Sequence, residues 1–345
     1  MGEGMTEFSL AEVEDLAFQV ALACGANRDN ARSLAASITA AEADGMRNVG
    51  LAHLPDYCDG LLAGRIDGQG CPVIRQPTPI IFQADGKSGL AHPAFDAAFE
   101  GLIEAAQTMG MAVFALKNAY TCGAAGYFAT RLAGKGLVAL VAANAGPASV
   151  ASFGTPKPVF GTNPLAFSVP VKGGPPLLID QSSCATTLVD LRTAAKVEEK
   201  IPAGWALDAD GNPTTDPTAA LLGALMPFGG YKGSNIALMV EMLAAGLTGA
   251  SWSCDAAPFN DGRTSPNVGL FVLALNPSSI FGEDIEGEGF EKRIADYLKR
   301  FEQEYSGRVP GKGKSNPAQP FPDGMITVDK SLLDHLRSYL ESKLS

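Results

Sequence analysis

The sequence predicts an α/β protein with two regions, a helical lobe over residues 1–71 and 285–345 and a mixed α/β region over residues 72–284. Three observations lead to this prediction. Apolar residues recur at helical spacing near both ends of the chain. Short β-rich runs separated by Gly, Pro and Asn begin near residue 72. A long, nearly unbroken apolar segment covers residues 232–247, as expected for a helix buried against a sheet.

The N-terminal part of the lobe is expected to hold three helices. Ser9 stands three residues before Glu12, which is the spacing of a capping box, and apolar residues follow at helical intervals until Gly25. A second, alanine-rich helix is expected over about 29–43 and a third over about 54–62. The lobe therefore begins with three short, closely spaced helices.

The remaining elements follow in chain order. Strands are expected over residues 112–116, 137–142, 165–169, 177–180 and 270–275, and the helix over 232–247 lies between the last two. Apolar residues at 290, 294, 297, 298 and 301 predict a further amphipathic helix. A flexible basic stretch at 307–314 follows, and a last short helix begins after Asp329.

Composition excludes several classes of function. The chain has 345 residues, 46% of them hydrophobic and 18% charged, and no apolar run approaches the roughly 20 residues of a membrane span. A net charge of -11 argues against nucleic-acid binding. Six scattered cysteines form no CxxC pair, so neither a metal site nor a thioredoxin-type site is expected. The expectation is a soluble, cytoplasmic protein with reduced thiols and a small-molecule ligand.

Two glycine-rich segments are candidates for phosphate binding. Neither a GxxxxGK[ST] loop nor a convincing GxGxxG unit is present. Residues 228–234 (FGGYKGS) stand directly before the long helix, so backbone amides, the helix N-terminus and Lys232 could hold a phosphate. The alternative is a simple turn that starts a buried helix. Residues 160–164 (FGTNP) are likewise explicable as a turn that leads into a strand.

Together these segments resemble the type-2 malate/lactate dehydrogenase family. The resemblance covers nearly the whole chain and rests on several motifs in order, at residues 123–127 (GAAGY), 161–164 (GTNP), 229–233 (GGYKG) and 310–311 (PG). Residues 225–249 are most similar to the branch of Δ1-piperideine-2-carboxylate and Δ1-pyrroline-2-carboxylate reductases.

The resemblance implies a homodimer with a non-Rossmann, largely antiparallel cofactor-binding sheet, and active sites near the subunit interface. It also implies that NADPH or NADH is the cofactor. The positions that match the family's nucleotide and substrate pocket are Gly161, Thr162, Asn163, Ser182, Ser183, Gly230, Lys232, Gly233, Arg308 and Lys312. Lys232 is the first candidate for a phosphate contact, and Arg192, Lys196 and Lys200 weakly favour NADP.

The sequence departs from the family at its two usual histidines. Val49 stands in place of the proton donor of the Ser-His-Gly motif, and Thr121 replaces the second histidine. A ketone reductase needs an acid because charge develops on oxygen. A cyclic imine can instead take its proton from solvent before hydride arrives. The loss is therefore tolerable for an imino acid substrate.

Five residues are the candidates for chemistry and substrate binding. Asp180 matches a family aspartate and could orient a substrate nitrogen, although a strand-end turn aspartate is an equal alternative. His53 shares a helix face with residue 49 only if the third helix includes Val49; otherwise it is a surface histidine. Asn48, Thr121, His53 or water could replace the missing acid, and Arg47 could hold a carboxylate.

The sequence leaves three functions to be tested. The first is an NAD(P)H-dependent reductase that acts on a cyclic imino acid, with the nicotinamide as hydride donor. The second is a dehydrogenase for 2-oxo and 2-hydroxy acids of the malate/lactate type. The third is a relative that binds nucleotide and has lost the reaction, because family resemblance alone does not establish activity at an altered site.

Overall fold

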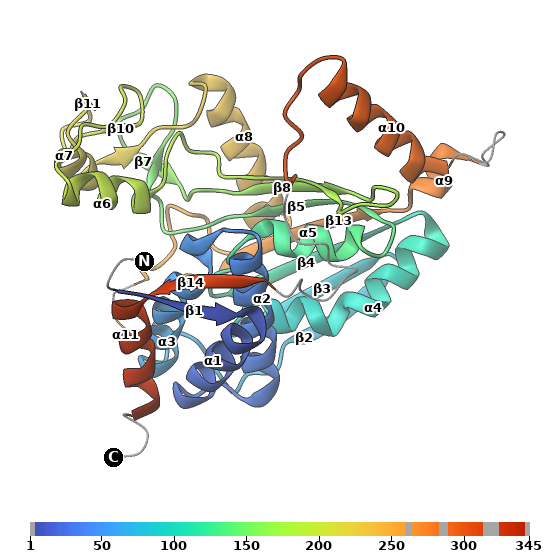
Figure 1. Ribbon diagram of the computed structural model, residues 1–345, viewed down its shortest axis with the longest axis horizontal. Coiled ribbons are helices and arrows are strands. Elements are labelled where there is room, and N and C mark those ends of the chain that lie inside the picture. The colour runs from blue at the N-terminus through green and yellow to red at the C-terminus, as the bar shows by residue number, and fades with distance from the viewer. Residues whose placement is uncertain (1–3, 260–261, 263, 283–288, 313–323, 342–345) are drawn as a thin grey trace.

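The computed structural model describes residues 4–259, 262, 264–282, 289–312 and 324–341 (Figure 1). A seven-stranded sheet runs through its centre in the order β2-β3-β4-β13-β5-β8-β9. Its strands are β2 (Val73–Thr78), β3 (Ile81–Gly89), β4 (Met111–Ala119), β5 (Val138–Ala143), β8 (Leu165–Val169), β9 (Leu177–Gln181) and β13 (Val268–Leu275). Only the β3–β4 pairing is parallel, so the sheet is mixed and largely antiparallel.

Helices cover both faces of this sheet. On one face, α4 (Ala91–Met109) and α5 (Ala125–Ala133) bury alternate strand residues such as Phe114 and Leu116. On the other, α8 (Tyr231–Glu241) continues into a π-helical turn, η3 (Met242–Gly246). A Cβ on Gly269 of β13 would lie 1.9 Å from the Ala244 carbonyl oxygen, so glycine is required for this close approach.

The prediction of one buried helix over 232–247 was wrong in two respects. The α-helix ends at Glu241, where the π-helical turn begins. One side of the segment is also exposed, because Leu238, Met242 and Leu247 keep 48%, 45% and 67% of their accessible surface. An apolar sequence did not reveal which side meets the sheet.

A second core joins the two ends of the chain. It is formed by α1 (Leu10–Ala23), α2 (Arg28–Ala43), α3 (Leu54–Leu62) and α11 (Lys330–Glu341). The predicted capping box is confirmed, since Ser9 and Glu12 exchange hydrogen bonds at the start of α1. Two strands that the sequence did not reveal, β1 (Met5–Ser9) and β14 (Met325–Asp329), pair antiparallel and tie the ends together.

The helix α10 (Gly289–Gln303) lies apart from this second core. It stands near α9 (Pro277–Phe281) above one end of the central sheet (Figure 1), where the Lys172 N–H donates to the Glu291 carbonyl at 3.3 Å.

The division into residues 1–71 with 285–345 and residues 72–284 stays a prediction. Among the described residues, no helix is long and apolar enough to cross a membrane.

A small five-stranded sheet, not anticipated from the sequence, lies beside α8. Its order is β11-β10-β12-β6-β7, from β6 (Val150–Ala151), β7 (Pro158–Phe160), β10 (Ala206–Leu207), β11 (Pro213–Thr214) and β12 (Ala224–Leu225). Strands of two or three residues leave little periodic pattern to read. Two helices, α6 (Leu188–Lys196) and α7 (Pro217–Leu221), pack against it.

Candidate functional site

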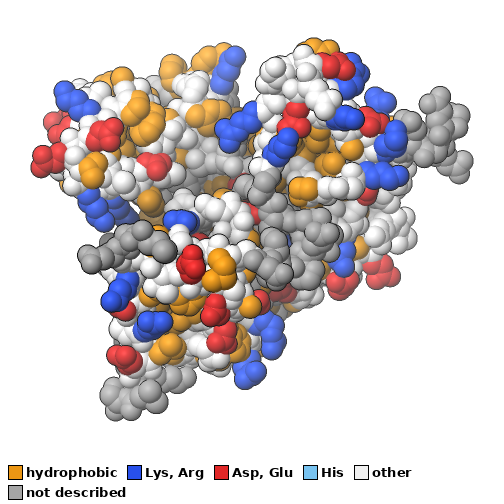
Figure 2. Space-filling view, in the orientation of Figure 1, with side chains coloured by type: hydrophobic (Ala, Val, Ile, Leu, Met, Phe, Trp, Pro, Cys, Tyr) orange, Lys and Arg blue, Asp and Glu red, His pale blue; other side chains and the backbone are white. Residues whose placement is uncertain are grey.

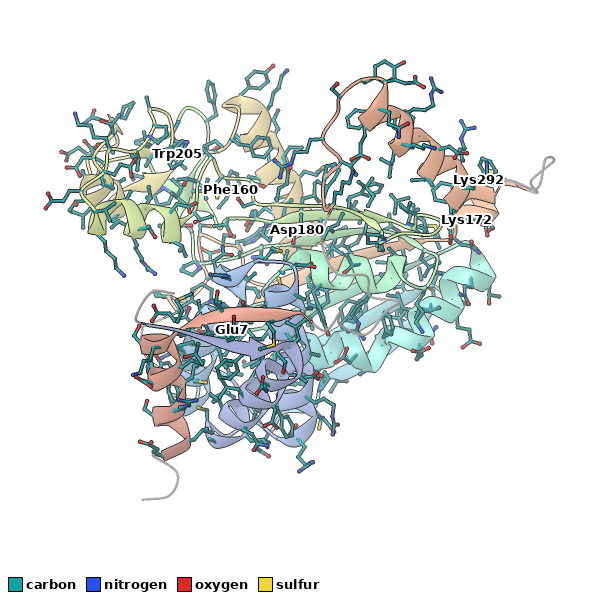
Figure 3. The ribbon with its side chains drawn as sticks, viewed as in Figure 1. Glu7, Phe160, Lys172, Asp180, Trp205 and Lys292 are labelled. Carbon is teal, nitrogen blue, oxygen red and sulfur yellow. The ribbon has the colours of Figure 1, made fainter. Side chains whose placement is uncertain are left out.

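A carboxylate takes the place of a helix cap at the start of α5. The N-cap residue, Ala124, has no side chain that could accept a hydrogen bond. Instead, Asp180 at the end of β9 accepts the Gly126 N–H at 2.9 Å. A Cβ at position 126 would lie 2.7 Å from that carboxylate oxygen, so glycine is required there. Asp180 is thus fixed at a helix N-terminus near the middle of the molecule (Figure 3).

The loop between β4 and α5 carries Thr121 and leads to this contact. Burial, followed by the charge of Asp180, raises the pKa of the Cys122 thiol to about 12, so the thiol stays protonated at neutral pH. Gly123 has a φ of +62°, and a Cβ there would lie 3.3 Å from the Tyr57 hydroxyl oxygen. The loop is therefore packed closely against α3.

His53 lies at the N-terminus of α3, on the other side of Tyr57. Its Nδ1 lies 3.0 Å from a carboxylate oxygen of Asp56, and this hydrogen bond is the largest cause that lowers the pKa of Asp56. The imidazole packs edge-on against the Tyr57 ring, with 4.9 Å between the centroids. His53 and the loop that carries Thr121 thus both pack against Tyr57, and the same loop leads to the Gly126–Asp180 contact.

The other two candidates lie farther out. Arg47 and Asn48 are exposed in a short 3-10 turn, η1 (Arg47–Val49), and His53 ends a second such turn, η2 (Leu51–His53). Because the two turns are separate, Val49 and His53 do not share the face of one helix. The Arg47 guanidinium donates to the Thr327 hydroxyl at 3.4 Å.

Asn163 is the centre of a buried polar network. Its amide donates to the Ala237 carbonyl at 3.1 Å and to the Glu241 carboxylate at 2.7 Å. Ser253 donates to the same carboxylate from its backbone N–H at 2.6 Å and from its hydroxyl at 2.8 Å. The Asn163 side chain is wholly buried. Its hydrogen bonds hold α8 against β8, which begins two residues after Asn163.

Neighbours of Asn163 tie the end of β9 to the same region. The Ser183 hydroxyl donates to the Asn163 carbonyl at 2.7 Å, and the Ser183 N–H donates to the Thr162 carbonyl at 2.8 Å. Ser182 accepts from the Cys184 thiol at 3.1 Å. A Cβ on Gly161 would lie 2.0 Å from the Ala145 carbonyl oxygen, which explains the glycine. These candidates for nucleotide binding therefore form one connected unit.

The glycine-rich turn before α8 leaves its backbone open next to the helix N-terminus. Gly229 and Gly230 have φ angles of +59° and +66°, and a Cβ on Gly229 would meet nothing within 4 Å. A Cβ on Gly233 would lie 1.8 Å from the Phe228 carbonyl oxygen, so the turn folds back tightly. Lys232 is exposed in the first turn of α8. An open backbone, a helix N-terminus and a cation therefore coincide.

The last candidates lie on the segment after α10. A Cβ on Gly311 would lie 2.9 Å from the Leu178 carbonyl oxygen, which places this segment against β9, two residues from Asp180. Arg308 is exposed, and the Lys312 ammonium lies 2.5 Å from the Glu302 carboxylate. Lys and Arg side chains rim a hollow between the surfaces of α8 and α10 (Figure 2).

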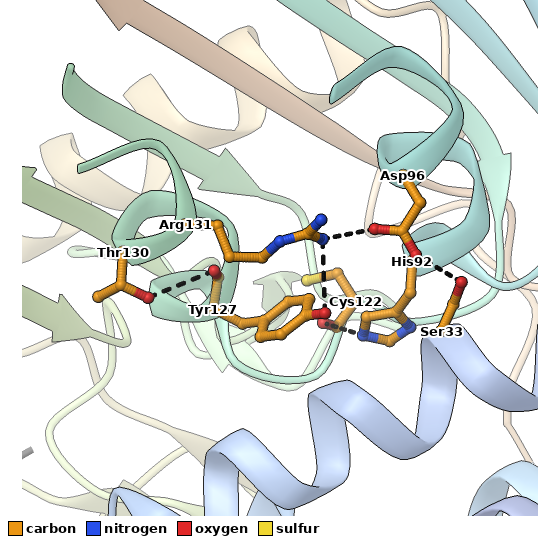
Figure 4. A network of polar contacts seen from close by, with 7 residues as sticks. All are labelled: Ser33, His92, Asp96, Cys122, Tyr127, Thr130 and Arg131. Carbon is orange, nitrogen blue, oxygen red and sulfur yellow. Dashed lines mark hydrogen bonds and ion pairs between the residues drawn. The ribbon is translucent and has the colours of Figure 1, made fainter. Parts of the chain in front are cut away.

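Sequence reasoning missed a network behind the loop that carries Thr121 (Figure 4). His92 Nε2 lies 3.1 Å from the Cys122 carbonyl oxygen. Asp96 contacts Arg131 at 2.5 Å and accepts from the Ser33 hydroxyl at 2.5 Å. His92 lies in the first turn of α4. The available signal was a histidine and an aspartate four residues apart on one helix face.

Known proteins resemble this chain over nearly its full length. The family model for malate/L-lactate dehydrogenase matches residues 8–337. The (2R)-3-sulfolactate dehydrogenase (NADP(+)) of Chromohalobacter salexigens is 34% identical over 97% of this chain and 98% of its own. The Δ1-pyrroline-2-carboxylate/Δ1-piperideine-2-carboxylate reductase of Pseudomonas putida is 34% identical, over 92% of each chain.

A solved structure shows the same likeness. The Δ1-piperideine-2-carboxylate reductase from Pseudomonas syringae pvar. tomato superposes with a TM-score of 0.88 at 31% identity, over 97% of this chain and 99% of that one. Sequence and fold therefore agree over nearly the whole chain. The chain belongs to the malate/L-lactate dehydrogenase family and is an oxidoreductase.

Proposed function

We propose that the chain is an NADPH-dependent reductase that transfers hydride to a small cyclic imino acid of the Δ1-piperideine-2-carboxylate or Δ1-pyrroline-2-carboxylate type. The observation that carries the proposal is the site itself. By the resemblance, Val49 and Thr121 stand at the family's histidine positions and Asp180 matches a family aspartate, whose carboxylate here accepts the Gly126 N–H at 2.9 Å. Relatives named for these two substrates support it. NADH is the alternative cofactor.

The residues present fit a dinucleotide. The turn at Gly229 and Gly230 leaves its backbone open, and Lys232 supplies a positive charge beside it. In the proposal, Gly230, Lys232 and Gly233 hold phosphate, with Gly161, Thr162, Ser182 and Ser183 as neighbours. Arg308 and Lys312 add charge from the segment beside β9. The seven-stranded sheet is then a cofactor-binding sheet of non-Rossmann type.

The chain's own groups bind and orient the substrate. A bound nicotinamide supplies the hydride. The Asp180 carboxylate attracts a protonated imine nitrogen and so favours the iminium over the neutral imine. Thr121 offers a hydroxyl at the same place, and Arg47 reaches the substrate carboxylate from the rim. No protein acid is needed, because the amine product takes no further proton in the hydride step.

A second candidate function has its own support. The relative at 34% identity over 97% of this chain is named as a sulfolactate dehydrogenase. In that reading the substrate is a 2-oxo acid, and His53, Asn48, Thr121 or water supplies the proton. His53 is the strongest of these because its Nδ1 is held by Asp56, which leaves Nε2 as the atom to carry an exchangeable proton. A relative that binds nucleotide without turnover is the third reading.

We further propose a cytoplasmic homodimer. Tyr231, Leu238, Met239, Met242 and Leu247 expose 41–67% of their surface along α8, η3 and the residue after it, and such an apolar strip can be an interaction surface. A second copy of this chain would cover it. None of the six cysteines forms a disulfide, which supports a reducing compartment. Light scattering of Leu238→Glu, with Leu222→Glu as an exposed control, tests the dimer.

The test of function is a comparison of substrates. Oxidation of NADPH is followed at steady state with Δ1-piperideine-2-carboxylate, Δ1-pyrroline-2-carboxylate, pyruvate, oxaloacetate and 3-sulfopyruvate, and repeated with NADH. The proposal expects kcat/KM for an imino acid to exceed that for every oxo acid. Turnover of oxo acids alone would establish the second reading, and nucleotide binding without turnover of any substrate would favour the third.

A further inference from the structure

His92 is a buried histidine that the proposed reaction does not use. Burial lowers its pKa to about 4, so the imidazole is neutral at the pH where the enzyme would be assayed. A neutral imidazole carries one N–H. Because the Cys122 carbonyl oxygen can only accept, Nε2 must hold that hydrogen and donate it at 3.1 Å. The tautomer is therefore fixed by the loop that carries Thr121.

Three aromatic side chains fix the plane of this imidazole. The Phe128 ring stacks on it at 5.6 Å with 16° between the planes. Tyr127 and Tyr57 meet it edge-on at 5.9 and 6.3 Å. His92 Nδ1 has no hydrogen-bond partner among the described residues, so the Nε2 bond is the imidazole's one polar attachment there. The Cys122 carbonyl is thus held by a donor that has little freedom to move.

This hydrogen bond holds the Cys122 peptide, which connects Thr121 to the segment before α5. The next residue, Gly123, is at a positive φ and in close contact with Tyr57. Three residues farther on, the Gly126 N–H holds Asp180. A shift of the Cys122 peptide would therefore be passed to Thr121 on one side and to the start of α5 on the other.

A separate set of contacts holds the same elements together. Asp96, one turn after His92 in α4, pairs with Arg131 of α5 and accepts from Ser33 of α2 (Figure 4). The Arg131 guanidinium also lies over the Phe99 ring at 4.3 Å. None of these contacts involves His92, so loss of its hydrogen bond is expected to move the loop while leaving the fold intact.

We propose that His92 is a positioning residue whose Nε2–H fixes the Cys122 carbonyl, and through it Thr121, Gly123 and the Gly126–Asp180 contact. This inference rests on the proposed function for its effect on turnover. It rests on the structure alone for its effect on the loop. The two effects can therefore be measured separately.

The experiment compares His92→Gln with His92→Asn. A glutamine places its amide nitrogen near the position of Nε2, whereas the shorter asparagine places it near Nδ1, out of reach of the Cys122 carbonyl. Both variants are polar and differ by one methylene, so they are a matched pair. His92→Leu removes the donor altogether, and His335→Gln on α11 is the control for a histidine away from the loop.

The first readout does not depend on activity. Alkylation of Cys122 by iodoacetamide is followed by peptide mass spectrometry, with exposed Cys71 and Cys254 as internal references. Cys122 is 5% exposed, so it should react slowly in the native chain and in His92→Gln. The rate should rise about 10-fold or more in His92→Asn and His92→Leu, as for local opening of the loop. Equal protection in all variants would overturn the proposal.

The second readout is kinetic. We expect kcat/KM for the imino acid to fall about 10-fold or more in His92→Asn and His92→Leu and to recover in His92→Gln, with the Kd for NADPH changed less than about 2-fold. A purely structural histidine would lower thermal stability equally in the Gln and Asn variants and leave turnover per folded molecule unchanged, and that result would also overturn the proposal. If the native chain turns over no imino acid, the proposed function fails, while the alkylation result still decides the role of His92.

Discussion

Replacement of Asn163 by alanine should strongly destabilise the protein. The substitution removes the donor to the Glu241 carboxylate at 2.7 Å and the donor to the Ala237 carbonyl at 3.1 Å, both in a fully buried place. A buried hydrogen bond to a charged group contributes about 2 kcal/mol and a neutral one about 1 kcal/mol. Asn163 also has a φ of +40°, where alanine costs about 1 kcal/mol more than asparagine. The free energy of unfolding should therefore fall by about 4 kcal/mol.

Urea unfolding measures this loss, and a second variant separates its two parts. Asn163→Gly removes the same side chain but tolerates the positive φ, so it should be more stable than Asn163→Ala by about 1 kcal/mol. Both variants should keep the slope of the unfolding transition, and both should bind NADPH more weakly because α8 is less firmly held. A loss below about 1 kcal/mol in Asn163→Ala would refute the reasoning.

Three further predictions concern single groups. Lys232→Ala should raise the Kd for NADPH about 10-fold, measured by nicotinamide fluorescence. The control Lys135→Ala, at an exposed helix end, should leave this Kd unchanged. Equal Kd values for the two variants would show that Lys232 does not contact the phosphate. Asp180→Asn should lower kcat for the imino acid about 100-fold, whereas Asp210→Asn in an exposed turn should leave it unchanged; full activity would exclude a role for the carboxylate. The folded pKa of His92 is about 4, against 6.5 for an exposed histidine, so protonation favours the unfolded chain as the pH falls from about 6.5 to 4. His92→Gln should lack this part of the acid destabilisation, up to about 3 kcal/mol in unfolding curves, and an unchanged pH dependence would contradict the buried neutral imidazole.

Short-range sequence patterns predicted the helices and strands whose bounds depend on residues near them in the chain. Ser9 and Glu12 form the predicted capping box because both partners lie within one turn. The helix α3 and the strand β8 have the predicted bounds, since each is a clear periodic run between turn residues. The order of strands in the central sheet was not available from such patterns, because it depends on contacts between distant segments.

Contacts between distant segments also explain what was missed. The pairing of β1 with β14 joins residues over 300 positions apart, and neither five-residue strand carries a strong signal alone. Lys232–Leu247 reads as one apolar helix, but the π-helical turn depends on the close approach of η3 to Gly269. Sequence similarity located Asp180, whereas its hydrogen bond to Gly126 required coordinates.

The roles predicted for the candidate site stay predictions: Asp180 to orient a substrate nitrogen, and His53 or Thr121 to supply a proton. The structure packs His53 and the loop that carries Thr121 against Tyr57, and it joins Asp180 to Gly126. The condition for a shared helix face of Val49 and His53 is not met, because each lies in its own 3-10 turn. Proximity of side chains from four elements cannot be read from spacing along the chain.

The most direct test of the central claim is hydride transfer itself. Purified protein is incubated with Δ1-piperideine-2-carboxylate and NADPH carrying two deuterium atoms at C4 of the nicotinamide, and the cyclic amino acid product is analysed by mass spectrometry. We expect a product with one deuterium at the carbon of the former C=N bond. A product without deuterium, or deuterium found only in the 2-hydroxy acid made from an oxo acid in a parallel reaction, would contradict it.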